Sequence, residues 1–341
     1  MKQISLQSIF HLMRVLRAYQ NTYLGALVSI LMLASLPINV QAQEYPSRPI
    51  NLVVGFPPGG SNDIVARILA PKFSEFIGAP VVVVNKPGSN ALIGTDYVAK
   101  AAPDGYTITL GSASPLVISP HTYAKMPFDV FKDLVGITTV ASTPELLVVN
   151  PGLPVKNLTE LIALSKKQQI TLASSGNGGL PHLAIELLRT SSKGDFLHVP
   201  YKGASPGIAD VVGGHANGII MDLPALYQLV VDGRLKPIAT LDKSRAQILP
   251  DLPTSVEQGA PIVLAFNWFG VMAPSKTHKP IIDKLFAALV KTAQSPDVKE
   301  ALLKMGIEPF TSASPEAFTA FLQIESTRWG KIAKESGARS D

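Results

Sequence analysis

The stretch "VVGFPPGGSNDIVARILA" at residues 53–70 decides the fold, because it passes from a buried strand to a helix through a short loop. An apolar run stops at Gly55, two prolines and two glycines follow, and helical spacing of apolar residues begins near Asp63. A loop of this kind turns unpaired backbone N–H groups toward a crevice, where the helix dipole favours an anion. The stretch therefore predicts an anion-binding turn in an α/β protein.

The rest of the chain alternates strand-like and helix-like segments in the same way. In the first part we expect a helix at 63–78 and strands at 50–56, 80–87 and 106–112. A second block of similar style begins with a strand at 145–150, and the chain ends mostly in helices. This order predicts parallel strands with helices packed on the sheet, in two α/β lobes.

Small-residue, hydroxyl-rich loops recur at the carboxyl ends of four predicted strands. They contain "GGSN" (59–62), "GSASP" (111–115), "ASSGNGG" (173–179) and "YKGASPG" (201–207). Ligands of open α/β sheets bind at such strand ends. Any one of these loops can be an ordinary turn or helix cap, but four together, two in each lobe, favour a binding cleft lined by backbone amides and serines.

Catalytic and metal-binding motifs are poorly represented. The sequence has no G-x-x-x-x-G-K-[ST] phosphate loop and no H-E-x-x-H motif. His182 and Glu186 have a spacing that suits two metal ligands, but an ordinary pair on a helix surface is the commoner meaning. Asp63 resembles a catalytic carboxylate, yet capping its helix and complementing the dipole is the simpler role. We expect no catalysis, no metal and no cofactor.

The N-terminus has the composition of a secretory signal. Lys2, Arg14 and Arg17 precede the apolar run "LGALVSILMLASL" (24–36), and small residues follow up to Ala42. An uncleaved membrane anchor is the alternative, but the run is shorter than the ~20 residues that a spanning helix needs. We expect residues 1–42 to be a signal peptide, cleaved near Ala42 on export to the periplasm.

Length and charge narrow the class further. The chain has 341 residues, of which 46% are hydrophobic, so it can bury a large core and form two domains. Removal of the three basic residues of the signal lowers the formal net charge from +5 to +2, and no basic cluster interleaved with aromatics remains. We therefore expect no nucleic-acid partner. With no cysteine, the chain has no disulfide and no thiolate nucleophile.

Several motifs resemble the Bug family, the substrate-binding proteins of bacterial tripartite tricarboxylate transporters. The similarity covers essentially the whole mature chain, in order. It is carried by "YPSRPINLVVGFPPGGSNDIVARILA" (45–70), "NKPGSNALIGTDYVAKAAPDGYTITL" (85–110), "SSGNGGLPHLAIELL" (174–188), "VPYKGASPGIADVVGGHANGIIMD" (199–222), "LPDLPTSVEQGAP" (249–261) and "FNWFGVMAP" (266–274).

The resemblance implies a two-lobed Venus-flytrap protein of type II periplasmic-binding-protein architecture, with a ligand cleft between the lobes. The first lobe would comprise residues 43–142 and 265–341, and the second residues 143–264. A monomer would capture a small carboxylate and deliver it to permease subunits of a tripartite tricarboxylate transporter. A periplasmic sensor that feeds a membrane receptor is the alternative, and an exported enzyme acting on a small carboxylate is a weaker one.

The resemblance also implies the ligand contacts, because such proteins hold one ligand carboxylate with backbone amides, small hydroxyls and ordered waters from both lobes. The first lobe would contribute Phe56, Pro58, Gly59, Gly60, Ser61, Asp63, Ser112 and Ser114. The second would contribute Ser174, Ser175, Gly176, Gly178, His182, Lys202, Gly203, Ala204, Ser205 and Asp222. The sequence departs from the family pattern at Gly55, at "PGSNA" (87–91) and at Gly179 and Leu180, which leaves the identity of the ligand open.

Overall fold

The computed structural model describes residues 10–11, 13–14, 17, 19 and 44–340. It divides into two compact units, residues 1–44 and 45–341. In the first unit the described positions before residue 44 are helical, whereas the apolar run of the predicted signal and its cleavage site near Ala42 lie outside the described residues. Within the described part of the chain, none of the helices combines the length and the apolar content needed to cross a membrane.

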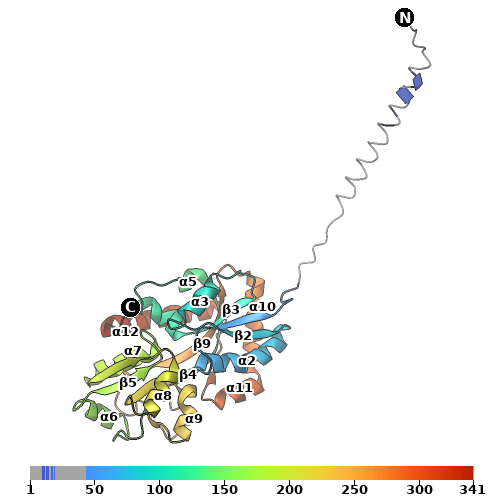
Figure 1. The fold of residues 1–341 in the computed structure, drawn as a ribbon. Coiled ribbons are helices and arrows are strands. Elements are labelled where there is room, and N and C mark those ends of the chain that lie inside the picture. Colours follow the sequence, from blue (N-terminus) through green and yellow to red (C-terminus); the bar gives the residue numbers. More distant parts are fainter. Residues whose placement is uncertain (1–9, 12, 15–16, 18, 20–43, 341) are drawn as a thin grey trace. The chain divides into compact units, whose positions relative to one another are not determined.

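The described part of the second unit is built on a mixed sheet of ten strands (Figure 1). The strand order is β2-β1-β3-β9-β4-β7-β5-β6, and β8 and β10 also pair with β4. The strands are β1 (Ile50–Val54), β2 (Val81–Asn85), β3 (Thr107–Ser112), β4 (Leu134–Val149), β5 (Ile170–Ser174), β6 (Phe196–Pro200), β7 (Gly218–Asp222), β8 (Lys236–Thr240), β9 (Phe266–Pro274) and β10 (Glu308–Pro309). Strands β1, β2 and β3 are parallel to one another, as are β5, β6 and β7, so the predicted parallel arrangement is confirmed in both blocks.

Helices pack on both halves of this sheet (Figure 1): α2 contacts β1, β2 and β3, whereas α7 and α8 contact β5 and β7. Asn157 is the N-cap of α6, and its side chain accepts a hydrogen bond of 2.8 Å from the Glu160 amide. The helices are α2 (Ser61–Ile77), α3 (Leu92–Ala99), the π-helical turn η1 (Ser114–Ile118), α4 (Ser119–Thr122), α5 (Val130–Asp133), α6 (Leu158–Ser165), α7 (Leu180–Ser192), α8 (Ala204–Val212), α9 (Leu223–Val231), α10 (Lys279–Gln294), α11 (Pro296–Leu303) and α12 (Pro315–Ser336).

Strand β4 joins the two halves of the sheet. It pairs with β9 as far as Pro144, opposite Phe266, and with β7 from Glu145 onward. The Glu145 amide donates to the carbonyl of Ala265 at 3.1 Å, so the chain enters and leaves the second half at adjacent positions. The sequence predicted only the last part of this strand. The first part was missed because two β-bulges, between Gly136 and Ala141, interrupt its regular alternation.

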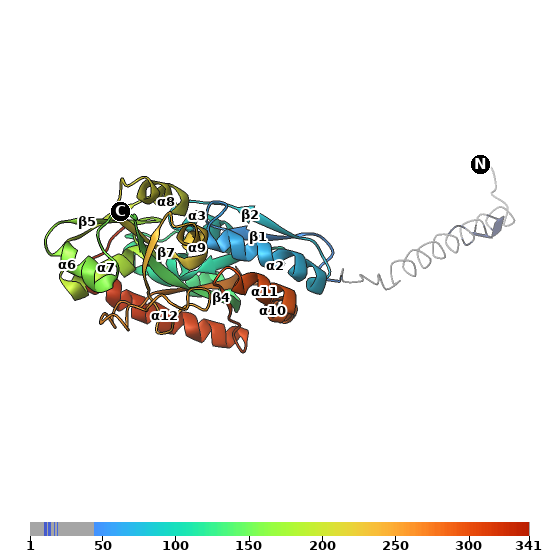
Figure 2. The ribbon, with the colours of Figure 1, turned by 90° about the horizontal axis from the view of Figure 1, so that it is seen from below.

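Each half of the sheet has an apolar core of its own, and a third core spans both halves. Helix α12 supplies Phe318 and Trp329 to the shared core, where the Phe318 ring meets the Trp268 ring edge to face at 5.8 Å between centroids. Figure 2 shows α12 along the underside of the sheet, and the helix contacts both β4 and α7.

Candidate ligand-binding site

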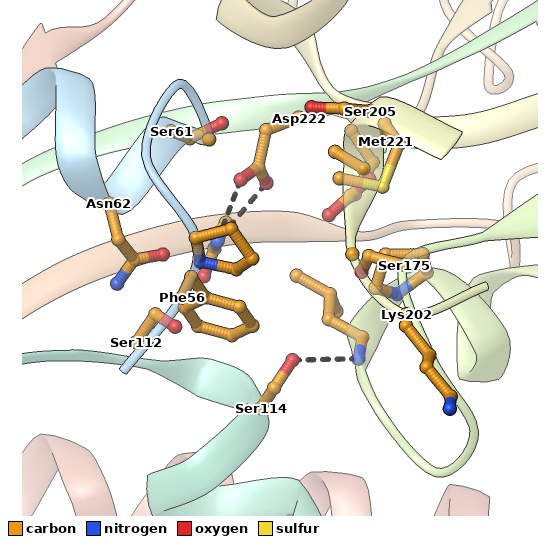
Figure 3. A pocket seen from close by; sticks show the side chains of 18 of the residues that line it. Phe56, Ser61, Asn62, Ser112, Ser114, Ser175, Lys202, Ser205, Met221 and Asp222 are labelled. Carbon is orange, nitrogen blue, oxygen red and sulfur yellow. Dashed lines mark hydrogen bonds between the residues drawn. The ribbon is translucent and has the colours of Figure 1, made fainter. Parts of the chain in front are cut away.

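A cavity of about 120 Å³ lies where the carboxyl ends of β1, β3, β5, β6 and β7 converge (Figure 3). We call it the central cavity. It is well below the ~300–1,000 Å³ of clefts that take drug-sized ligands, so it suits a small molecule. Its lining residues are Phe56, Pro57, Pro58, Gly60, Ser61, Asn62, Ser112, Ser114, Glu145, Ser175, Leu180, Pro181, Lys202, Gly203, Ala204, Ser205, Pro206, Met221, Asp222 and Asn267.

Most of the predicted ligand contacts meet at this cavity, and they come from both halves of the sheet. Those that line it are Phe56, Pro58, Gly60, Ser61, Ser112, Ser114, Ser175, Lys202, Gly203, Ala204, Ser205 and Asp222. Gly176 lines a second cavity of about 530 Å³, which shares Ser175 and Lys202 with the first and which we call the outer cavity. Gly59 lies at a separate hollow, and Asp63, Ser174, Gly178 and His182 line neither of these two cavities.

Four helices begin at the central cavity. The N-caps of α2, α7 and α8 are Gly60, Gly179 and Gly203, which have no side chain to cap the helix, and the N-cap of α9 is Asp222. Leu180, in the first turn of α7, donates its N–H to Ser114 Oγ at 3.0 Å (Figure 3). Free N–H groups and the positive ends of the helix dipoles attract negative charge, so this convergence favours an anion.

Asp63 stabilises the loop between β1 and α2 through its hydrogen bonds. Its Oδ2 accepts hydrogen bonds from the Gly59 amide at 3.0 Å and from Arg67 Nε at 2.9 Å, while its Oδ1 accepts one from Asn85 at 2.9 Å. Burial works against ionisation, but these hydrogen bonds and the Arg67 charge hold the pKa of Asp63 below its usual value. Asp63 lies in the first turn of α2, as predicted for complementing the dipole, but Gly60 is the N-cap.

His182 belongs to a buried cluster that shapes the loop before α7. Its ring stacks on His198 with 3.8 Å between centroids, and its Nδ1 accepts a hydrogen bond from the Gly178 amide at 2.9 Å. Ser174 Oγ lies 2.6 Å from His198 Nε2. Burial, with a contribution from His182, lowers the pKa of His198 to about 3, so the ring is neutral. The described residues contain no group of three or more side chains that could hold a metal ion.

Glu145 and Asn267 are cavity residues that the sequence reasoning missed. Asn267 donates to both carboxylate oxygens of Asp222, at 3.0 and 3.1 Å (Figure 3). Glu145 lies opposite Asp222 in the β4–β7 ladder, is 1% exposed, and has no hydrogen-bond partner for either oxygen among the described residues. Burial and the neighbouring Asp222 raise the pKa of Glu145 well above its usual value. A glutamate inside the apolar run "ELLVV" was the one available signal.

Comparison with known proteins agrees with this geometry. Residues 65–338 match the model of the tripartite tricarboxylate transporter family receptor, TctC. The chain is 37% identical to protein BugT of Bordetella pertussis over 90% of this chain and 94% of that protein.

Solved structures of high similarity bear this out. The periplasmic binding protein BugD superimposes with a TM-score of 0.82 at 33% identity, covering 87% of this chain and all of that one. Rpa4515 of R. palustris, solved with adipate, gives a TM-score of 0.84 at 32% identity, covering 87% of this chain and 99% of that one. The predicted two-lobed, type II periplasmic-binding-protein fold is thereby confirmed. With its matched sequence, its fold and its cavity at the strand ends, the chain belongs to the receptor family of the tripartite tricarboxylate transporters, a family of periplasmic solute-binding proteins.

Proposed function

We propose that this protein captures a small carboxylate in the central cavity and delivers it to the permease subunits of a tripartite tricarboxylate transporter. The observation that carries the proposal is the convergence of α2, α7 and α8 on one small cavity, each with a glycine as its N-cap residue. Oriented backbone N–H groups can bind a carboxylate without an arginine, and bridging waters can complete its coordination. The adipate bound by Rpa4515 is a ligand of this chemical class.

Closure of two lobes would complete the site. We assign residues 43–142 and 265–341 to the first lobe and residues 143–264 to the second, with the ligand cleft between them. Ser114 and Leu180, which would then lie in different lobes, are already hydrogen-bonded, as are Thr122 and Gly178. A ligand that touches both lobes adds contacts only in the closed state, so it shifts the population toward closure.

A thermal-shift screen of the mature protein tests carboxylate capture, because a ligand that binds only the folded form raises the melting temperature. Small mono- and dicarboxylates are compared with their uncharged amides, for example adipate with adipamide. We expect stabilisation by one or more carboxylates and none by the matched amides. Stabilisation by an amide, with none by any carboxylate at millimolar concentration, would overturn the proposal.

Delivery to a transporter has sensing as its alternative. Uptake of the labelled ligand is measured in cells with and without the gene, in parallel with ligand-induced transcription. A transport receptor is required for uptake itself, whereas loss of induction with normal initial uptake would indicate a sensor. N-terminal sequencing of the protein from the periplasmic fraction tests export, with a new terminus expected close to residue 43.

A further inference from the structure

The central cavity has an acidic end, formed by Glu145 and by Asp222, which is also the N-cap of α9. Asp222 closes β7, Glu145 faces it from β4, and both side chains are buried, at 5% and 1% exposed. Asn267, from β9, donates to the two oxygens of Asp222. The oxygens of Glu145 accept nothing from the described residues, although this side chain lines the cavity. A buried carboxyl group that accepts no hydrogen bond costs free energy, so a donor from a ligand would stabilise it.

The groups packed around Asp222 supply donors but no full positive charge. They are Glu145 itself, Asn267 and the Ser61 hydroxyl at the start of α2, and Asp222 is also the N-cap residue of α9. Among the described residues that line the central cavity, Lys202 alone is basic, and it is exposed. Figure 3 shows its side chain extending away from Asp222. None of the described residues of the cavity wall therefore places a full positive charge beside Asp222 and Glu145.

Building on the proposed function, we infer that the ligand carries an ammonium group as well as its carboxylate, and that Glu145 and Asp222 receive this ammonium group. A second ligand carboxylate at this end would be repelled by the pair. A hydroxyl group would satisfy one oxygen and leave the charge in place. An ammonium group offers three donors and a positive charge, so it satisfies both unpartnered oxygens of Glu145 and reaches Asp222. The ligand class is therefore a zwitterionic amino acid.

Proton exchange gives this inference a second signature. In the empty cavity burial and the Asp222 charge raise the pKa of Glu145, which favours the protonated form of this carboxyl group. An ammonium group that binds beside the pair replaces that proton as the source of positive charge. Binding of an amino acid should therefore release a proton to the buffer near neutral pH, whereas binding of the matched carboxylate without the ammonium group should release none.

Calorimetry with three matched sets of ligands tests the inference on the mature protein. The sets are alanine, lactate and propionate; aspartate, malate and succinate; and 4-aminobutyrate, 4-hydroxybutyrate and butyrate. In each set the members differ only in an ammonium group, a hydroxyl group or a hydrogen atom. We expect one set in which the ammonium member binds at least tenfold more tightly than the other two, with proton release measured in buffers of different ionisation enthalpy.

Two variants test whether Glu145 causes the preference for the ammonium member. Glu145→Gln keeps the shape of the side chain but presents an amide, so it should lose the preference for the ammonium member and the proton release. Glu325→Gln changes another buried carboxyl, one that binds Trp329 in α12, and should keep both. Circular dichroism confirms that each variant is folded.

The outcomes separate the two proposals. If members of a set bind equally well, and Glu145→Gln binds them like the native protein, the ammonium inference is wrong while carboxylate capture stands. Tightest binding of a hydroxyl or hydrogen member also overturns the inference. If no carboxylate of any kind binds, the proposed function itself fails.

Discussion

Asn267 holds Asp222 by both carboxylate oxygens and thereby fastens β9 to the end of β7. The Asn267 Oδ1 atom in turn accepts from the amides of Ala113 and Trp268, at 3.3 and 3.0 Å. One side chain therefore connects segments that carry cavity residues in both halves of the sheet. Its hydrogen bonds fix the position of Asp222 before any ligand arrives.

Replacement of Asn267 by alanine should destabilise the protein by about 2–3 kcal/mol, because it leaves a buried carboxylate and two backbone amides without their partner. Urea unfolding of the ligand-free protein measures the change. Gln323→Ala, at an exposed position of α12, serves as the control and should stay within about 0.5 kcal/mol of the native protein. An equally small effect of Asn267→Ala would show that solvent replaces this hydrogen-bond network.

Glu145→Gln should make the protein more stable at pH 7.5 and hardly change it near pH 4. In the fold, burial and Asp222 raise the pKa of Glu145 above its unfolded value. Stability from such a group is fully present below the unfolded pKa of about 4.3 and is lost as the pH rises toward the folded pKa. The glutamine amide does not titrate, so the variant escapes this loss. Above the folded pKa, the loss is about 1.4 kcal/mol for each unit by which the folded pKa of Glu145 exceeds its unfolded pKa.

Urea unfolding at pH 4.5, 6 and 7.5 follows this linkage, with ligand absent throughout. The difference between the two proteins should grow steadily with pH. Parallel stability curves over the whole range would mean that Glu145 titrates alike in the folded and unfolded chains.

Gly203→Ala should weaken ligand binding far more than Lys202→Ala does. Gly203 has a φ of +110°, and an added Cβ would lie 3.4 Å from Pro57 Cγ on the facing loop, so the alanine strains the backbone at the cavity wall. Lys202 is exposed, and its loss should cost at most about tenfold in affinity, or 1.4 kcal/mol.

Isothermal titration with a confirmed ligand compares the two variants with Gly337→Ala. Gly337 also has a positive φ, +71°, but an added Cβ meets open space there, away from the cavity. This control should bind normally. The backbone-amide account of binding is untenable if Lys202→Ala abolishes binding and Gly203→Ala does not.

Ser114→Ala should lower both stability and affinity, each by about 1 kcal/mol, since the Leu180 amide at the start of α7 loses its partner. Thr327→Ala, at an exposed site in α12, provides a hydroxyl deletion outside the cavity. Differential scanning calorimetry and titration measure the two effects. Unchanged affinity in Ser114→Ala would exclude this contact from the ligand-binding conformation.

Small-angle scattering should show a smaller radius of gyration with ligand than without it. The hydrogen bonds of Thr122 with Gly178 and of Ser114 with Leu180 join the proposed lobes, and a bound ligand should increase the population in which they form. A radius that does not change, when tight binding is shown independently, would mean a preformed site with no closure.

The sequence revealed most of the loops but little of the acidic end. Gly60, Ser114 and Gly203 could be found because turns and helix starts are marked by local residue types. Glu145 and Asn267 could not, since their meeting with Asp222 depends on the register of strands distant in the chain.

The same limitation affects two predicted contacts that turn away from the central cavity. Asp63 accepts hydrogen bonds from Arg67 and Asn85, and the His182 ring stacks on His198. Asn85 lies on a neighbouring strand, β2, and His198 lies on β6. The residue spacing within a motif therefore could not predict that these partners would hold Asp63 and His182 away from the central cavity.

Pro144 and Phe266 are paired in the β4–β9 ladder, so the segment between them is an insertion whose two ends lie side by side. Residues 146–264 can therefore be exchanged for the corresponding segment of a relative by two cuts placed side by side. Such a chimera would import a foreign set of Ser175, Lys202 and Asp222 equivalents while keeping Ser61, Glu145 and Asn267 of the host. The ligand site of the chimera would then combine residues of two receptors. Exchange of this segment is a route by which a family of receptors can change its ligands while keeping the fold.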